Sequence, residues 1–269
     1  MQPIRNQRGF IIQLVVGLIV GLFALLSYFF TTDVVENPIT GESQRVSLTP
    51  TEEIALGLEA VSEISRQYGG LHPDRQAQAL VDQIGQRLVD QSAAGQTGYR
   101  YEFHLLADSQ TINAFALPGG QIFITQGLFQ RLSNNNELAG VLAHEIGHVA
   151  ARHAAERIAK AKLTEGLTGA AVIATYDPDN SNSLPTRQMA ALVGQMVNMK
   201  YSRDDELQSD RLGVDFMIEA GFDPRGMLRV MEVLADAGAG NRLPDFFSTH
   251  PNPANRLERL RKLIAERSQ

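Results

Sequence analysis

His144, Glu145 and His148 form the pattern H-E-x-x-H, whose residue types and spacing suit metal-assisted hydrolysis. Apolar residues recur around it at positions 138, 141, 142, 146 and 149, which predicts a helix with one buried face. Side chains four residues apart share a helix face, so both imidazoles can bind one ion. Glu145 is rotated by about 100° and lies beside that ion. We therefore expect zinc bound by two histidines, with a carboxylate placed to take a proton from water.

A catalytic zinc site usually has a third protein ligand, and the sequence offers two kinds. His153 follows His148 by five residues, whereas a known histidine pattern needs six, and on a continuing helix it points about 140° away. We expect it to support the site or face solvent. The alternative is a carboxylate in residues 202–211, where Glu206 and Asp210 share one helix face. One could bind zinc while the other orients a histidine, and the spacing leaves open which does so.

The composition limits the possible chemistry. The chain has 269 residues, a net charge of −6 and no cysteine. Disulfides, thiol nucleophiles and cysteine-containing zinc sites are therefore excluded, and the charge does not favour nucleic acid as a partner. A zinc site built only from histidine and carboxylate ligands favours catalysis over a structural role.

Residues 10–30 form an uncharged apolar stretch, which as a helix spans about 30 Å. Arg5 and Arg8 precede it, which places the N-terminus in the cytoplasm and the following domain across the membrane. In a bacterium that side is periplasmic or otherwise extracytoplasmic. A cleaved signal peptide is the alternative, but residues 26–30 form a poor cleavage site, and no polar face suggests a core helix. We expect an uncleaved single-pass anchor in contact with membrane lipid.

The chain divides into a short segment 1–9, the anchor 10–30, a linker 31–49 and one domain 50–269. The domain is predicted to be α+β and mainly helical, with a small sheet. Helices are expected at 50–68, at 73–91, around the histidine pattern, as a hairpin around the polar loop 176–185, within 187–237 and at 253–267. Strands are expected at 99–105, with His104 on the polar side, and around the Pro-Gly-Gly turn within 112–125. This strand pair is either an ordinary hairpin or a sheet edge that can bind an extended peptide.

Four segments together, in the same order, resemble the M48 family of zinc metalloendopeptidases. They are NAFALPGG at 113–120, HEIGHVAARH at 144–153, SRDDELQSD at 202–210 and STHP at 248–251. The resemblance implies a zincin-type domain of the gluzincin kind. With one predicted span, and without the helical repeats that follow this domain in some relatives, the chain resembles the single-anchor or soluble branch.

The resemblance also implies roles for particular residues. Glu206 would be the third zinc ligand, and Asp210 would support the ligands from behind. His250 would come near the zinc, to stabilise the oxyanion or to restrict access. Arg256 matches a basic position, whose role could equally be a structural salt bridge. The implied substrate-pairing strand consists of Asn113, Ala114, Phe115, Ala116 and Leu117.

The expected function is that of an endopeptidase with one Zn²⁺ per chain and Glu145 as the general base. Its substrates would be unfolded or extended polypeptides at the membrane, as in protein quality control. The main alternative is a membrane-tethered chaperone or binder of unfolded chains, whose latent zinc site is capped by His250. An exopeptidase would need a group that binds a peptide terminus, and no motif for one is found.

Overall fold

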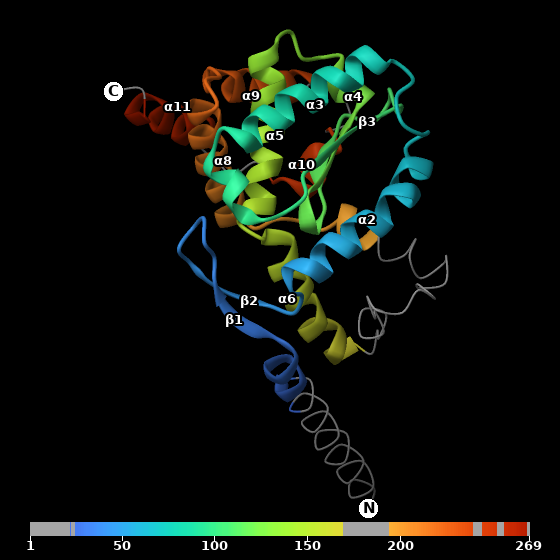
Figure 1. The fold of residues 1–269 in the computed structure, drawn as a ribbon, viewed down its shortest axis with the longest axis vertical. Helices are drawn as coiled ribbons and strands as arrows, with labels where there is room; N and C mark the ends of the chain where they lie inside the picture. The colour runs from blue at the N-terminus through green and yellow to red at the C-terminus, as the bar shows by residue number, and fades with distance from the viewer. Residues whose placement is uncertain (1–21, 23–24, 169–193, 239–243, 252–255, 268–269) are drawn as a thin grey trace, which may run out of the picture.

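The computed structural model describes residues 22, 25–168, 194–238, 244–251 and 256–267 (Figure 1). The predicted helical hairpin around residues 176–185 and most of the predicted anchor 10–30 lie outside these residues. Among the described residues, none of the helices has the length and apolar character needed to cross a bilayer. The described part is mainly helical with a small sheet, which confirms the predicted fold class.

Helix α5 (Asn135–Ala150) carries the histidine pattern and runs through the centre of the domain (Figure 1). All of its residues from Glu137 onward are buried. Helices α3 (Arg75–Asp90), α8 (Arg203–Glu219) and α9 (Arg225–Ala237) pack against it, as does part of the sheet. Because close packing restricts side-chain motion, a helix that is buried on all sides holds the side chains of the histidine pattern in fixed positions.

Two glycines let α5 and α8 approach closely. A Cβ atom on Gly147 would lie 2.7 Å from Ser209 Oγ, and one on Gly213 would lie 3.2 Å from the backbone of Ala143. The Ser209 hydroxyl also donates a hydrogen bond to the carbonyl of His144. This approach brings the face of α5 that carries His144 and His148 beside the acidic first turn of α8.

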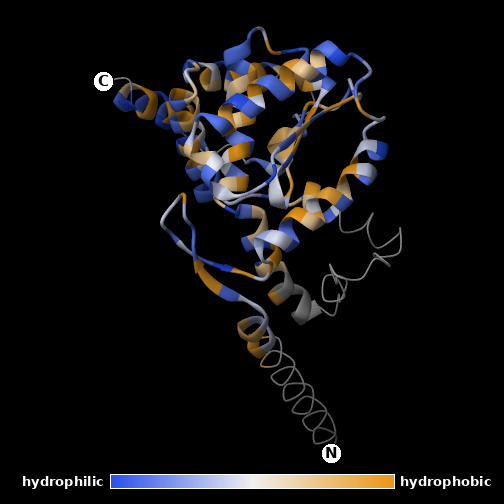
Figure 2. Cartoon of the chain, viewed as in Figure 1, coloured by the Kyte–Doolittle hydropathy of each residue, from blue (hydrophilic) through white to orange (hydrophobic). Residues whose placement is uncertain are grey.

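The main sheet has the order β3-β5-β4. Strand β3 (Glu102–Leu106) is parallel to β5 (Gln121–Thr125), and β4 (Ala114–Ala116) is antiparallel to β5. The strand pair around the Pro-Gly-Gly turn is therefore confirmed, and β4 is an edge strand. The turn is the 3-10 helix η2 (Pro118–Gly120), in which Gly119 has a φ of 80°, where a Cβ atom is disfavoured. The strands are largely hydrophobic in Figure 2.

Helix α2 (Pro50–Gln67) begins as predicted, with a capping box between Thr49 and Glu52. It lies across the turn η2. The short 3-10 helix η1 (Ala93–Thr97) follows α3, and helix α4 (Gln126–Phe129) follows β5. Further along the chain follow α6 (His153–Thr168), α10 (Phe246–Thr249) and α11 (Arg256–Arg267).

The segment 31–49, expected as a linker, contains an antiparallel hairpin of β1 (Asp33–Glu36) and β2 (Ser43–Val46). Its polar residues are not all solvated. Asn37 Nδ2 donates to the carbonyl of Ala150 at 2.9 Å, and Gln44 Nε2 donates to that of Ala151 at 2.5 Å. The hairpin thus satisfies carbonyls at the end of α5, which have no partner within the helix.

Candidate metal centre

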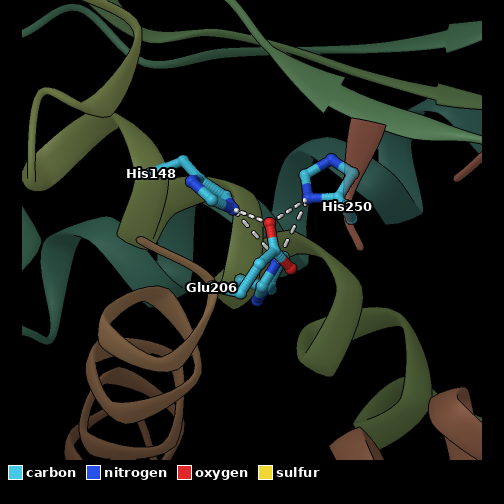
Figure 3. A group of neighbouring side chains, drawn as sticks. His148, Glu206 and His250 are labelled. Carbon is cyan, nitrogen blue, oxygen red and sulfur yellow. Dashed lines mark hydrogen bonds and ion pairs between the residues drawn. The ribbon is translucent and has the colours of Figure 1, made fainter. Parts of the chain in front are cut away.

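Four buried side chains converge between α5, α8 and α10: His144, His148, Glu206 and His250. Their donor atoms all lie within 4.8 Å of one another. Figure 3 shows the rings of His148 and His250 directed at the Glu206 carboxylate. His144 and His148 lie one turn apart on α5, and Glu206 lies in the first turn of α8.

The spacing of these atoms fits a zinc ion. The Nε2 atoms of His144 and His148 are 3.1 Å apart, and they lie 3.5 and 3.4 Å from the Glu206 oxygens. His250 Nδ1 is 3.1 Å from Glu206 Oε1 and 3.4 Å from His144 Nε2. Tetrahedral zinc with bonds of about 2.0–2.1 Å has ligand atoms roughly 3.3–3.4 Å apart. Histidine and carboxylate donors at these separations are therefore a suitable zinc-ligand set.

Unpaired polar atoms point to the same conclusion. Both carboxylate oxygens of Glu145 and His250 Nε2 are buried without a hydrogen-bond partner among the described residues. Leaving buried polar atoms unpaired costs free energy, so such a cluster indicates a place for an ion, water or substrate. Glu145 Oε1 lies 3.6 Å from His250 Nε2 and so borders the metal centre, as the sequence predicts for a general base.

Asp210 and Arg256 contact the residues of this cluster: Asp210 contacts His144, and Arg256 contacts Glu206. Asp210 Oδ1 is 3.0 Å from His144 Nδ1, so it can accept that proton and leave Nε2 free for the metal. Arg256 Nε and Nη2 donate to the two Asp210 oxygens at 2.7 and 2.8 Å. Arg256 Nη1 lies 2.7 Å from Glu206 Oε2. Arg256, whose role the sequence left open, thus joins the carboxylate of Glu206 to the carboxylate of Asp210 beside His144.

The electrostatics of the metal-free centre are set by burial and by these partners. Burial raises the pKa of Glu145. Burial would also raise the pKa of Glu206, but His250 and the other two histidines hold it well below its usual value. Burial lowers the pKa of His148. Burial acts in the same direction on His144, but Asp210 and Glu206 outweigh it and raise the His144 pKa to about 9.

Two further residues contact His148: Tyr201, which sequence reasoning missed, and His153, which it expected either to support the site or to face solvent. The ring of Tyr201 stacks on the His148 ring, with their centroids 3.8 Å apart. His153 Nδ1 lies 2.9 Å from His148 Nδ1, on the side away from the metal. His153 is therefore not among the four donors, in agreement with the prediction. Its position results from a break in the helix that the periodicity of the sequence did not reveal.

The proposed substrate strand lies close to this centre. Residues Asn113 to Leu117 are all buried, and β4 packs against α5. Phe246, at the start of α10, donates its backbone N–H to the carbonyl of Ile112 at 3.1 Å. Helix α10, which His250 follows directly, is therefore hydrogen-bonded next to the edge strand. Whether this strand binds substrate stays a prediction.

The fold and site are those of a metallopeptidase, and the comparison of sequences gives the family. Residues 75–264 match Peptidase family M48, and the chain belongs to this family. The chain is 31% identical over 227 residues to the Beta-barrel assembly-enhancing protease of Yersinia pestis, a match covering 82% of this chain and 45% of the relative. It is 28% identical over 235 residues to the Mitochondrial metalloendopeptidase OMA1 of Schizosaccharomyces pombe, covering 85% and 66%. The chain thus spans about half the length of the first of these relatives.

Proposed function

We propose that this chain is a zinc-dependent endopeptidase that cleaves unfolded or extended polypeptides. The observation that carries the proposal is the convergence of four zinc-type donors beside the unpaired, buried carboxylate of Glu145. Membership in a peptidase family and similarity to a metalloendopeptidase support it. His144, His148 and Glu206 would bind one Zn²⁺ ion.

The chemistry expected of zinc in this site is Lewis-acid activation of water and of the peptide carbonyl. Glu145 accepts the proton of the attacking water and then donates it to the leaving amine nitrogen. One group can perform both steps, because the carboxylate accepts the proton and the resulting carboxylic acid returns it. Asp210 keeps the proton of His144 on Nδ1, and Arg256 holds both acidic side chains in place.

The register of β4 supports an extended substrate. Thr125 donates its N–H to the Asn113 carbonyl, and Leu117 donates to the Gln121 carbonyl. Because antiparallel strands alternate, the backbone groups of Ala114 and Ala116 then point away from β5, toward the edge of the sheet that is not paired with another strand of the described residues. Within the described part of the chain, these groups have no hydrogen-bond partner on that side. A peptide in extended conformation could pair with them, whereas a folded domain could not.

A latent form of the enzyme is the second candidate, and one observation favours it. His250 Nδ1 lies close to both Glu206 and His144, where it would complete a closed, four-ligand zinc site. Catalytic zinc sites keep one position open for water or substrate. Cleavage would then require withdrawal of His250, and a chain that held its cap permanently would bind unfolded polypeptides without cleaving them.

We also propose that residues 10–30 anchor the chain in a membrane, with the peptidase domain on the side opposite the N-terminus. The support is the uncharged stretch preceded by Arg5 and Arg8. The described residues at its end expose apolar side chains, with Phe30 at 86% and Phe29 at 53%. A role in protein quality control follows from the preference for unfolded substrates.

The proposal is tested by incubating a permanently unfolded protein with the purified full-length chain, before and after removal of zinc. Mass spectrometry of the products should reveal internal cuts that stop on chelation and resume when zinc is restored. Release of single terminal residues would contradict the endopeptidase assignment. Suppression of aggregation without any cleavage would favour the chaperone alternative.

A further inference from the structure

The turn that follows the central helix has an unusual backbone. Helix α5 ends at Ala150, α6 begins at His153, and Arg152 between them has a φ of 55°. A left-handed backbone conformation is uncommon for residues other than glycine. Contacts with the surrounding structure must therefore stabilise it at Arg152. The turn ends helix α5. On a continuing helix the His153 side chain would point away from His148, whereas after this turn its ring lies beside the His148 ring.

A buried ion pair holds this turn. Arg152 donates to Glu53 Oε1 on α2 through both Nε and Nη2, and the Nε distance is 2.9 Å. Arg152 Nη2 also donates to the Leu48 carbonyl at 2.9 Å. The other Glu53 oxygen accepts the hydroxyl of Tyr99 at 3.0 Å. Glu53 is 1% exposed and Arg152 is 9% exposed. The conformation of the turn is thus fixed by segments far away in the sequence.

If His148 binds a metal, the donor and the acceptor in each hydrogen bond of His153 are determined. His148 Nε2 faces the other donor atoms, so its lone pair must be free, and the proton of the neutral ring lies on Nδ1. That proton is donated to His153 Nδ1 at 2.9 Å. His153 then carries its own proton on Nε2 and donates it to Gln208 Oε1 at 2.8 Å. If the Gln208 amide were reversed, the chain of donors would reverse too, and a proton would occupy His148 Nε2.

We propose that His153 is a positioning residue for the metal ligand His148, and that Gln208 and the Arg152–Glu53 pair hold His153 in its accepting orientation. His153 does for His148 what Asp210 does for His144: each accepts the Nδ1 proton and aims Nε2 at the metal. The inference rests on the zinc site of the proposed function but not on peptide cleavage, because it concerns metal binding alone.

The test is the zinc affinity of the full-length chain, measured without substrate by competition with a chromogenic chelator. His153→Ala should weaken zinc binding by about 10- to 100-fold, the usual effect of losing such a partner. His153→Asn should restore most of the affinity, because its amide oxygen can accept the same proton. His72→Ala is the matched control, since His72 lies outside the metal centre and its ring accepts the N–H of Asp74. Circular dichroism of the metal-free proteins checks folding.

A second pair of variants covers the case in which His153→Ala does not fold. Gln208 lines a cavity of about 300 Å³, so changes there cause little overpacking. Gln208→Glu keeps an acceptor for His153 and should bind zinc at least as tightly as the wild type, whereas Gln208→Ala should bind several-fold more weakly. Wild-type affinity in a folded His153→Ala variant, or in Gln208→Ala if His153→Ala does not fold, would overturn the proposal. Equal losses in His153→Ala and His153→Asn would also overturn it, because the hydrogen bond would then contribute nothing. Failure of cleavage alone would leave these results unchanged.

Discussion

Arg256 Nη1 lies 2.7 Å from Glu206 Oε2, so helix α11 places a positive charge directly against the carboxylate that we propose as the third zinc ligand. The same guanidinium binds both oxygens of Asp210. At 2% exposure, Arg256 is among the largest fully buried side chains. Its charge offsets part of the repulsion between the two carboxylates when no metal is bound. The last described helix is therefore part of the metal centre.

Arg256→Ala should destabilise the metal-free protein by about 3–5 kcal/mol, because it leaves two buried carboxylates without their partner. Urea denaturation in the presence of a chelator measures this. Arg267→Ala is the control, since Arg267 is on the same helix and forms an exposed pair with Asp215. It should leave the denaturation midpoint unchanged. Equal midpoints for all three proteins would contradict a central role for Arg256.

Gly147→Ala should lower both zinc affinity and the melting temperature. The added Cβ atom would lie 2.7 Å from Ser209 Oγ and 2.9 Å from its carbonyl oxygen, which forces α5 away from α8. Overpacking of this kind costs about 1–3 kcal/mol. Gly194→Ala, where an added Cβ atom has no neighbour within 4 Å among the described residues, should not lower the melting temperature. Unchanged zinc affinity in Gly147→Ala would show that the helix separation does not control the ligand geometry.

The metal-free protein should lose stability as the pH rises from about 6.5 to about 9. The pKa of His144 is raised to about 9 in the folded state, because Asp210 and Glu206 outweigh the effect of burial. A raised pKa means that the folded protein holds this proton more tightly, so the stabilisation is complete below about 6.5 and is lost as the pH passes through about 9. Urea denaturation across this range should show a decline that is absent in His144→Ala. A flat profile for the wild type would contradict the interaction.

His250→Ala should increase the cleavage rate of an unfolded substrate if His250 caps the site. The prediction follows from the position of His250 Nδ1 beside Glu206 and His144. The rates of both proteins are compared at equal zinc content. A lower rate in the variant would contradict capping and would indicate instead that His250 stabilises the oxyanion.

Local patterns made much of the site predictable. The helix around His144 and His148 follows from its apolar periodicity and their spacing, and the cap at Thr49 marks the start of α2. The family resemblance added His250, whose distance along the chain from the other ligands hides its role from any local pattern. The structure brings its Nδ1 within 3.4 Å of His144 Nε2.

The features that were missed depend on contacts between distant residues. Asn37 and Gln44 have the polar character of a linker, and only the structure shows that they bind the carbonyl end of α5. Likewise, Arg152 lies in what reads as a continuous helix, and its left-handed turn requires Glu53, nearly a hundred residues earlier. Tertiary contacts override local helix periodicity at such points.

The most direct test of the central claim compares the wild type with Glu145→Gln at matched zinc content, with digestion of an unfolded protein as the readout. The substitution keeps the size of the side chain but removes the base, so zinc should remain bound while the rate of internal cleavage falls by roughly 10²- to 10⁴-fold. Equal cleavage by both proteins would show that Glu145 is not the base and would contradict the mechanism derived from this site.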